Sequence, residues 1–412
     1  MTDAKGDSAS AICERFYQYA REHSGQNLDI EVSGVSVLLI QRHEEADQVL
    51  RRHADRYRKN MAWFRLTLGS SRFSEDGEAW RVRHALTHSH FTRFDRDRTI
   101  RVARECATRA IERMMAASAA GATTIDDRIL REMTVSVVVE NFLDIPMADL
   151  DLDLDAIATL MEYGAIYSLV PAGKTEAQYQ ETLRLLPAVR RRIIKNLRVF
   201  RDGRIAASPM LAGMLAADAD PATGVVLEHE LMTLFAAAAE AATATMGWIC
   251  YLLARYPHIQ EDLRRAALAN DDEPIADFIS EALRLYPPSP ILGRIAAMPD
   301  TVDGRQVEPG QNVMISLIGV GHDRRLRADP WALDLGPAAR RSRDSGVVTG
   351  FSTGPRVCGG KQFALTELIA FVSTYLTRAR FLLTSTEQPR FRWKAQLVRH
   401  GGQPVQAVPL QR

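Results

Sequence analysis

Apolar side chains recur every three or four positions along most of the chain, which is the spacing of a buried helix face. The clearest segments of this kind are residues 8–23, 44–52, 78–91 and 362–378. Residues 28–32 alternate apolar and polar side chains instead, and Ser33-Gly34 turns the chain into the segment 35–40, which predicts a β-hairpin. The chain is therefore expected to be mainly helical, with a smaller β region.

The middle of the chain follows the same helical pattern. From residue 101 to about residue 204 one helix follows another, with breaks at Pro146 and Pro171. The acidic run 149–155 is expected to be a solvated turn that opens a helix. Residues 301–307 read as two short strands around an Asp303-Gly304 turn, and a further strand covers residues 312–317.

The longest helical pattern, residues 225–255, is apolar on all sides. Between Leu231 and Ala254 the strongly ionisable side chain is Glu240. A stretch of about 20 apolar residues is long enough to span a membrane, but alanine is a weak membrane residue and a carboxylate in lipid is costly. We therefore expect a helix through the core of a soluble protein, and the buried Glu240 then requires a partner or a function.

Cys358 lies in the loop 350–360, directly before the predicted helix 362–378. Unpaired N–H groups at a helix N-terminus stabilise a thiolate, and a thiolate in a rigid loop suits a metal. Since no second cysteine or histidine lies nearby in the sequence, a four-ligand zinc or iron–sulfur site is not favoured. An isolated cysteine in such a turn is most often structural, whereas one thiolate is what an axial haem ligand requires.

The pattern Phe-x-x-Gly-x-Arg-x-Cys-x-Gly around this cysteine resembles the haem-binding signature of the cytochrome P-450 superfamily. Its members here are Phe351, Gly354, Arg356, Cys358 and Gly360. Ser352 departs from the pattern, because many relatives have glycine there. The resemblance implies heme b with Cys358 as the iron ligand, and it extends over nearly the whole chain, with the motifs in the family's order. A single domain, residues 1–412, is therefore expected, without a fused reductase.

Other segments resemble the family's contacts to the haem propionates. Trp80 and His84 stand one helical turn apart on one face, as the family's aromatic-then-basic pair does. The resemblance assigns Arg294 and Arg356 to the same group. His84 and His88 are also spaced for metal binding, but no His-Glu-x-x-His carboxylate accompanies them, so a separate metal site is not favoured.

Residues 235–243 resemble the family's oxygen-binding segment, in which an acid precedes a threonine. The acid is present as Glu240, whereas Ala241 stands in place of the threonine whose hydroxyl helps to deliver protons in relatives. Thr243 lies about 200° around a helix from that position, and Thr245 lies on the same face a full turn away. The oxygen-activating relay therefore keeps the family's acid at Glu240 and departs from the family pattern at Ala241.

Glu281 and Arg284, followed by Leu285-Tyr286-Pro287-Pro288, resemble the family's Glu-x-x-Arg motif. On its own this i, i+3 spacing indicates a surface ion pair. The resemblance implies a buried structural network that is completed by an arginine ahead of the cysteine loop. Three residues are candidates for this third member, namely Arg340, Arg341 and Arg343.

Substrate contacts are carried over from the family by position. Residues 61–66 are interpreted as a loop that lines the pocket, and residues 398–405 resemble a closing hairpin whose tip often touches the substrate. The pocket candidates are Trp63, Phe64, Phe235, Ala237, Ser289, Ile291 and Leu292. The sequence does not identify the substrate.

The composition mainly excludes certain partners and cellular locations. The 412 residues carry a net charge of +1 with 25% charged residues, which gives no argument for a nucleic-acid partner. Four scattered cysteines form no disulfide framework, and the N-terminus has no apolar signal or anchor, so a cytoplasmic protein away from the membrane is expected. Electrons are expected from a separate ferredoxin or flavodoxin with its reductase, with Arg356 and Lys361 facing an acidic partner.

The resemblance implies an O₂-dependent monooxygenase that acts on a small organic substrate, in secondary metabolism. Because Ala241 replaces the threonine, a substrate hydroxyl or an ordered water is expected to assist oxygen activation. The alternative is atypical haem chemistry, such as peroxide-driven oxidation, radical coupling or nitration. A haem sensor without turnover is a third hypothesis, which a fused output domain would have supported.

Overall fold

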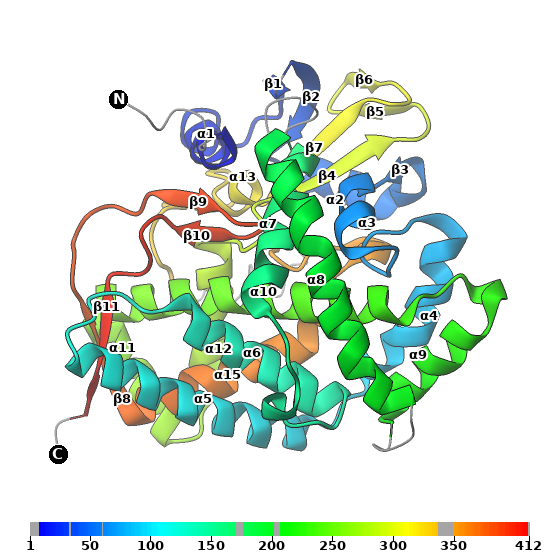
Figure 1. The fold of residues 1–412 in the computed structure, drawn as a ribbon. Helices are drawn as coiled ribbons and strands as arrows, with labels where there is room; N and C mark the ends of the chain where they lie inside the picture. Colours follow the sequence, from blue (N-terminus) through cyan, green and yellow to red (C-terminus); the bar gives the residue numbers. More distant parts are fainter. Residues whose placement is uncertain are drawn as a thin grey trace.

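The structure, a computed structural model, describes residues 8–32, 34–59, 61–169, 176–201, 207–336 and 349–410. Over these residues a large helical region lies beside a smaller β region, whose main sheet occupies the upper part of the molecule in Figure 1. The expected mainly helical fold with a small β part is confirmed.

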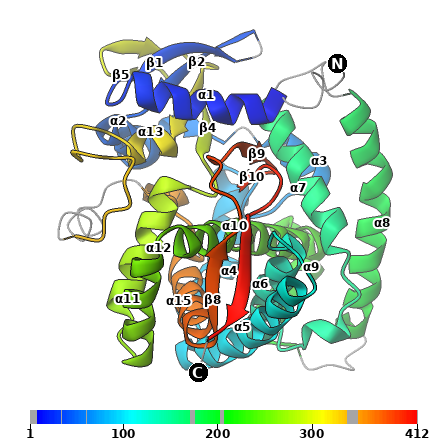
Figure 2. The same cartoon turned by 90° about the vertical axis from the view of Figure 1, so that its left-hand side faces the viewer.

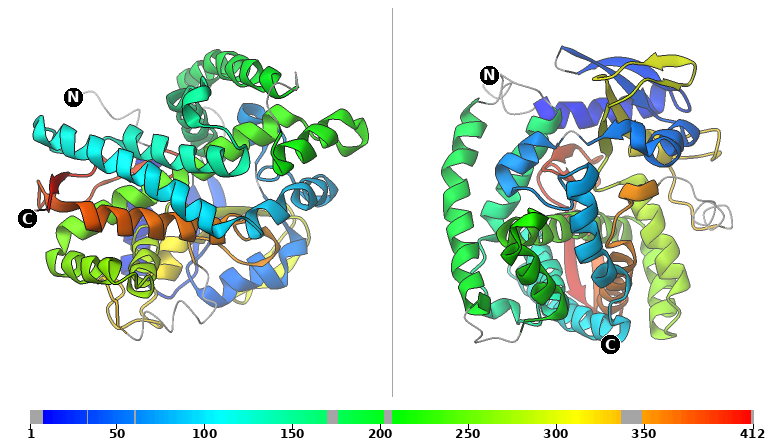
Figure 3. Two further views of the ribbon diagram at one scale, coloured as in Figure 1. Left: turned by 90° about the horizontal axis from the view of Figure 1, so that it is seen from below. Right: turned by 90° about the vertical axis from the view of Figure 1, so that its right-hand side faces the viewer.

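Four helices form the centre of the helical region: α5 (Arg96–Ala119), α6 (Asp127–Phe142), α10 (Leu227–Arg255) and α15 (Lys361–Arg378). α5 packs against both α6 and α15, and α10 packs against α6. Seen from below, α5 and α15 run side by side across the molecule (Figure 3). These helices carry much of the main hydrophobic core.

The remaining long helices surround this centre: α4 (Gly77–Thr92), α7 (Leu154–Leu169), α8 (Glu176–Arg201), α9 (Pro209–Ala219), α11 (Pro257–Leu268) and α12 (Glu273–Leu285). α7 packs against α8 and α10, whereas α4 contacts α9 and α15. In the view of Figure 2, α8 runs along the outer edge of the molecule beside α7. The predicted succession of helices in the middle of the chain is confirmed for the described residues.

α10 runs through the interior, as the sequence predicted. Among the described residues it is the one helix whose length and composition would allow it to cross a membrane, and 83% of its most apolar window lies inside the protein. An apolar helix surrounded by other helices in this way is a core helix.

The main sheet joins an early and a later part of the chain. Its strand order is β1-β2-β7-β4-β3, with β1 (Leu28–Val32), β2 (Val35–Ile40), β7 (Asn312–Ser316), β4 (Ile291–Ala296) and β3 (Tyr57–Arg58). β1 and β2 form the predicted hairpin, and β2 runs parallel to β7. β5 (Asp300–Val302) and β6 (Arg305–Val307) form the second predicted hairpin. α1 (Ser8–Glu22), α2 (His43–Asp47) and α13 (Leu317–Gly321) lie beside the sheet (Figure 2).

The closing hairpin predicted for residues 398–405 is wrong in its pairing. β10 (Leu397–Arg399) pairs with β9 (Phe391–Trp393), whereas β11 (Val405–Pro409) pairs with β8 (Ala379–Leu383). The two strands therefore belong to different two-stranded sheets. β10 instead forms a hairpin with the strand just before it, whereas β11 pairs with β8, which lies much earlier in the chain.

The segment predicted as a loop at residues 61–66 is also different. Residues Ala62–Leu68 form a helix, α3, which packs against α7. Phe64 and Leu68, one helical turn apart, are both buried. The packing of these two side chains explains the helix, which a short segment would rarely form by itself.

Candidate active site

Cys358 lies three residues before α15, at the end of the loop that the motif predicted. It is exposed, whereas Cys13, Cys106 and Cys250 are buried, and these four are all the cysteines of the chain. Its backbone N–H donates to the Phe351 carbonyl oxygen at 2.9 Å, and the Gly360 N–H donates to its sulfur. The thiol therefore reaches solvent from a loop whose backbone is held in place on both sides.

The surroundings of the Cys358 sulfur are cationic. Although the thiol is exposed, protein atoms crowd it closely, and the resulting loss of hydration raises its pKa. The Gly360 N–H and the positive charges of Arg72, Lys59 and Lys361 lower the pKa and oppose this effect. Amide and cationic groups of this kind stabilise the thiolate, the form that binds a metal.

Gly354 shows why the loop needs a glycine. Its φ is +73°, and a Cβ atom there would lie 2.1 Å from the carbonyl oxygen of Leu50. Leu50 belongs to the π-helical turn η1 (Gln48–Arg52), on which the loop rests. Gly360 differs, because a Cβ atom there would meet no other group within 4 Å. The loop is thus fixed on one side and faces open space beside the sulfur.

α10 carries a strip of methyl groups that neighbouring elements leave partly uncovered. From Glu230 to Ala254, the residues that are not fully buried are Ala237, Ala238 and Ala241. Residues at i, i+1 and i+4 share one face of a helix, so the three methyl groups point in a similar direction. The methyl strip, as we call these three residues, is the face on which the sequence placed the oxygen site.

Glu240 turns away from the methyl strip. Its side chain is buried, and the Nε of Arg131 on α6 donates to its Oε1 at 2.7 Å. Arg131 also lies 3.2 Å from Asp155, at the start of α7. Burial raises the pKa of Glu240, while the charge and hydrogen bond of Arg131 lower it. The buried carboxylate therefore has the partner that its position required.

The two nearby threonines are both engaged in hydrogen bonds. Thr243 lies 3.2 Å from the hydroxyl of Thr134 on α6, and Thr245 donates to the Ala241 carbonyl oxygen at 2.8 Å. Both side chains are buried. Neither threonine therefore supplies the hydroxyl group that is missing at Ala241.

The structure gathers the residues predicted to bind propionates. The rings of Trp80 and His84 lie 4.8 Å apart, and the Arg356 guanidinium lies 4.7 Å from the centre of the Trp80 ring. Arg356 also contacts Asp76 at 3.1 Å. Arg294, buried on β4, is close enough to Arg356 for their charges to repel. Within the described residues no three metal-ligating side chains cluster, at the stacked His84–His88 pair or elsewhere.

We call Lys59, His84, Arg294 and Arg356 the cationic cradle. The pKa shifts of these residues show an excess of positive charge. Burial lowers the pKa of Arg294 to about 10, and Arg356 adds repulsion. Burial, followed by Arg72, His88 and Arg356, lowers the pKa of His84 to about 4. Burial also lowers the pKa of Lys59 well below its usual range, with further repulsion from Arg356 and Arg294.

These features fit a haem group with its two carboxylates. Buried cations that share Asp76 need a further anion, and propionates supply two negative charges. The Cys358 sulfur is exposed, Gly360 has open space beside it, and the methyl strip adds an apolar face that is not fully buried. Trp80, His84, Arg294 and Arg356 would hold the propionates, and Cys358 would hold the iron.

Glu281 and Arg284 form a buried network on α12. Arg284 donates twice to the Glu281 carboxylate, at 2.9 and 2.7 Å. Among the described residues a third member is Arg327, which lies 3.1 Å from Glu281. The three arginines proposed for this place, Arg340, Arg341 and Arg343, lie outside the described residues. Sequence reasoning missed Arg327 because no familiar motif surrounds it.

The residues predicted to line the substrate pocket differ in their burial and in the faces they occupy. Phe64 and Ile291 are buried and Leu292 is half-buried, whereas the side chain of Trp63 is not described. Phe235 is buried about 120° around α10 from Ala241, so it does not share the methyl strip, to which Ala237 belongs. Ser289 donates to Gln396 at 3.3 Å.

Other residues near the site were not predicted from the sequence, namely Lys59, Arg72, Asp76 and Arg131. Each acts through a partner that is distant along the chain, such as Arg356 for Asp76 and Glu240 for Arg131. One indication of such residues was present in the sequence, namely the buried Glu240, because a buried carboxylate requires a cation near it.

Comparison with known proteins agrees with this arrangement. The sequence profile of the family "Cytochrome P450" matches residues 7–403. Cytochrome P450 4F12 of Homo sapiens is 30% identical over 184 residues, which cover 40% of this chain and 35% of that protein. Cytochrome P450 4X1 of Rattus norvegicus is 31% identical over 182 residues, or 40% of this chain and 36% of that protein.

Cytochrome P450 4A6 of Oryctolagus cuniculus is 34% identical over 171 residues, covering 38% of this chain and 34% of that protein. The aligned part of the chain thus spans about a third of the length of these curated relatives. The family profile, by contrast, matches almost from end to end, and it includes the Cys358 loop, the methyl strip and the cationic cradle. The chain therefore belongs to the cytochrome P450 family, whose haem iron is held by a cysteine thiolate.

Proposed function

We propose that the protein is a haem-dependent monooxygenase of a small organic substrate in which a substrate hydroxyl or a water molecule replaces the usual threonine. The observation that carries this proposal is the methyl strip, Ala237, Ala238 and Ala241, beside a Glu240 that is turned toward Arg131. Membership of the family and the exposed Cys358 sulfur support the haem chemistry itself.

When bound, the haem supplies an iron whose thiolate ligand favours cleavage of the O–O bond. The balanced reaction takes O₂, two electrons, two protons and a C–H bond to a C–OH group and one water. The protein must therefore bring two protons to a region that its methyl groups keep free of side-chain donors. The source and path of these protons distinguish this chain from the family pattern.

Glu240 is the acid closest in the sequence to that region. Its carboxyl group points about 100° away from Ala241 around the helix and is bound to Arg131 at 2.7 Å. A proton held on Glu240 therefore needs a bridging hydroxyl or water to reach the face of Ala241. Thr243 and Thr245 already use their hydroxyls elsewhere, so the bridge comes from the substrate or from solvent.

The test is Ala241→Thr, measured as product formed per NADH consumed, with a redoxin, its reductase and a substrate identified by spectral titration of the haem. Substrate or water assistance predicts that the wild type is already well coupled and that the added hydroxyl brings no improvement. Ala238→Thr, which adds the same hydroxyl elsewhere on the methyl strip, is the matched control. A large gain in coupling for Ala241→Thr alone would contradict the proposal.

A second candidate function rests on the same methyl strip. Peroxide-driven oxidation, radical coupling and nitration need a side-chain proton relay less, so a strip without hydroxyls suits them too. Products that form with hydrogen peroxide, but not with O₂ and the reductase system, would favour this candidate. A haem-binding protein that gives no product under either condition would favour a sensor.

The electron donor and the setting are further parts of the proposal. A separate ferredoxin or flavodoxin with its reductase would supply electrons in the cytoplasm, and a substrate from secondary metabolism would suit such an enzyme. Lys361 follows the Cys358 loop and adds a positive charge near an exposed Val357, which suits an acidic protein partner. Reduction rates with each redoxin, compared for the wild type and Lys361→Glu, test this part.

A further inference from the structure

A small cavity lies between α6, α10 and the segment that joins β10 to β11. Its volume is about 10 Å³, which is room for about one water molecule. Asp127 lines it from α6, and Thr243 and Ala244 line it from α10. Arg399 and Gln403 close it from the side of the strands. We call this space the α6–α10 cavity.

Two polar atoms of the residues around this cavity have no hydrogen-bond partner among the described residues. They are Oε1 of Gln403 and Nη1 of Arg399, and these residues are only 4% and 8% exposed. Both residues are held in place, because the Gln403 carbonyl oxygen accepts from the Ile125 N–H at 3.1 Å and Arg399 Nη2 donates to the Glu387 carbonyl oxygen at 2.8 Å. A buried polar atom without a partner costs free energy, so these two atoms point to a small polar ligand beside them.

Water is the ligand that suits both atoms. The Gln403 Oε1 needs a donor, the Arg399 Nη1 needs an acceptor, and one water molecule supplies both. A metal cation would leave the guanidinium without an acceptor, and an anion would leave the amide oxygen without a donor. The Thr243 hydroxyl, which lies 3.2 Å from that of Thr134, has capacity for a further hydrogen bond and gives the water a third partner.

The cavity lies one helical turn beyond the Arg131–Glu240 pair. Asp127 and Arg131 stand four positions apart on one face of α6, and the same spacing separates Glu240 from Ala244 on α10. Arg131 binds Glu240 at 2.7 Å. Asp127 and Ala244 line the cavity together. The ion pair and the cavity therefore follow one another along the contact between the two helices.

Asp127 is placed to exchange protons with solvent. It is partly exposed, whereas Glu240 is buried. Burial raises the pKa of Asp127, against the positive charges of Lys394 and Arg131. Burial also raises the pKa of Glu240, and the negative charge of Asp127 raises it further. An acid whose pKa lies closer to the working pH takes up and releases a proton more readily.

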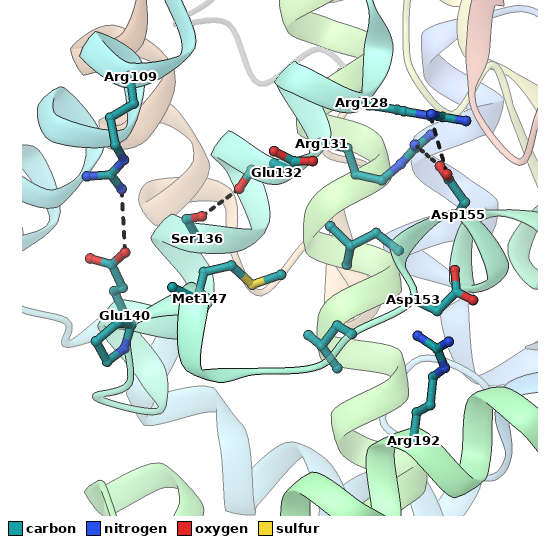
Figure 4. Close-up of a pocket in the computed structure, with 14 residues that line it drawn as sticks. Arg109, Arg128, Arg131, Glu132, Ser136, Glu140, Met147, Asp153, Asp155 and Arg192 are labelled. Carbon is teal, nitrogen blue, oxygen red and sulfur yellow. Dashed lines mark hydrogen bonds and ion pairs between the residues drawn. The ribbon is translucent and has the colours of Figure 1, made fainter. Parts of the chain in front are cut away.

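The other side of the Arg131–Glu240 pair offers no route for protons. Figure 4 shows Arg128 and Arg131 reaching the same carboxylate, Asp155, at 3.3 and 3.2 Å. Asp155 is 56% exposed and could take protons from solvent. A guanidinium keeps its protons in proteins, however, so Arg131 does not pass a proton from Asp155 to Glu240. Protons must therefore arrive from the side of the cavity.

We propose that the α6–α10 cavity binds one water molecule, through which Asp127 passes protons from solvent to Glu240. The Asp127 carboxyl group gives a proton to the water, and the water releases one of its own to the Thr243 hydroxyl, which hands one on to the Glu240 carboxylate. Asp127 then takes a new proton from solvent, so each cycle moves one proton and no electrons. The water site stands by itself, whereas the proton path rests on the proposed role of Glu240.

A crystal structure of the haem-loaded protein tests the water site. Electron density for one water molecule is expected within about 3.2 Å of Gln403 Oε1 and Arg399 Nη1. In Ala244→Val the added methyl groups occupy the cavity, and the water should be displaced. Ala242→Val, at a buried position of α10 that does not line the cavity, is the matched control and should keep the water. An empty cavity or a bound ion in the wild type would overturn the site.

The proton path is tested by the rate of product formation, with the redoxin, reductase and substrate of the Ala241→Thr assay. Asp127→Asn should lower this rate by about tenfold or more and increase its solvent deuterium isotope effect, because proton supply becomes slow. Asp127→Glu, which restores a carboxyl group, should recover most of the rate. Asp126→Asn is the matched control, since this N-cap residue does not line the cavity and asparagine caps a helix equally well.

Glu240→Gln separates this inference from the proposed function. If Glu240→Gln slows product formation and Asp127→Asn does not, the proton path is wrong and the role of Glu240 stands. If neither variant slows it, the path and the role of Glu240 fail together, and the crystal structure alone decides the water site. Equal losses in Asp127→Asn and Asp127→Glu, with an unchanged isotope effect, would show that Asp127 serves only the fold.

Discussion

Ser352 holds a backbone conformation that disfavours a side chain. Its φ is +64°, in the left-handed region, and its buried hydroxyl has no hydrogen-bond partner. The family pattern has glycine at this position of the cysteine loop, and glycine adopts positive φ without strain. The departure seen in the sequence therefore corresponds to a local strain beside the haem ligand.

Ser352→Gly should therefore stabilise the protein. Relief of a left-handed φ is worth about 1 kcal/mol, and part of this is offset by the larger entropy of glycine in the unfolded chain. Denaturant unfolding of the haem-loaded protein measures the change. Thr353→Gly, at a neighbouring residue with an ordinary φ of −147°, should destabilise instead. If both variants lose stability, the conformational argument is wrong.

At the scale of single residues, the sequence predicted those that belong to a motif. Cys358, Trp80, His84 and Arg356 could be named because local spacing and family resemblance both identify them. Arg131 could not, because it reaches Glu240 from 109 positions away. The direction of the Glu240 side chain could not be predicted either, because it depends on which helix packs against α10.

At the scale of elements, the Glu281–Arg284–Arg327 network connects α12 to the segment after α13. Replacing one member of a buried charged network leaves the others without compensation, at a cost of about 3–5 kcal/mol. Glu281→Gln should therefore lower the free energy of unfolding by this amount, measured by denaturant titration. The haem spectrum of the folded protein should stay unchanged, because the network is structural.

The matched control for this prediction is Glu261→Gln on α11. Glu261 and Arg264 have the same i, i+3 spacing as Glu281 and Arg284, but their side chains are 52% and 31% exposed, against 3% and 10%. Exposed pairs contribute little, so this variant should lose far less stability. Similar losses in the two variants would mean that burial is not what makes the network important.

A second buried pair joins α4 to the start of α10. Arg83 lies 3.1 Å from Glu230, and both side chains are buried. Burial raises the pKa of Glu230 to about 7, against the lowering effects of the Arg72 N–H and the Arg83 charge. In the unfolded chain the same carboxyl group titrates near 4.5.

The stability of the protein should therefore depend on pH between about 4.5 and 7. In this window folded Glu230 holds a proton that unfolded Glu230 releases, so the free energy of unfolding falls as the pH rises. Glu230→Gln should reduce this slope, and Glu228→Gln on the same turn is the control. Parallel pH profiles for the wild type and Glu230→Gln would refute the assignment.

Helices and hairpins were predicted well where the pattern was local. The predicted helix 362–378 is observed as Lys361–Arg378, and the first hairpin has the expected register. The C-terminal hairpin was predicted wrongly, because β10 pairs with the preceding strand β9, and β11 pairs with the more distant β8. Pairing between distant segments depends on the assembled core, which periodicity does not describe.

At the scale of the whole molecule, the cationic cradle links haem binding to stability. Without the haem carboxylates, Arg294, Arg356 and Lys59 repel one another in a buried place. A ligand present at about 1,000 times its Kd adds about 4 kcal/mol, which for a chain of this length raises Tm by about 5 °C. Removal of the haem should therefore lower the calorimetric Tm by at least this amount.

Arg294→Leu should act in opposite directions in the two forms. The haem-free variant loses a buried repulsive charge and should unfold at or above the Tm of the haem-free wild type. The haem-loaded variant loses a propionate contact and should release haem faster to apomyoglobin. Equal destabilisation of both forms would show that Arg294 serves packing rather than the haem carboxylates.

The contact between Gly354 and Leu50 has a consequence for how the protein is made. The cysteine loop takes its shape by resting on a turn near residue 50, and the main sheet likewise combines strands from both parts of the chain. On the ribosome, the early strands must wait until β4 and β7 have emerged, and the turn near residue 50 must wait until the Cys358 loop has emerged. Haem capture is therefore a late event of synthesis, and a chain that stops before α15 leaves an open cradle of unpaired cations for chaperones and proteases to recognise.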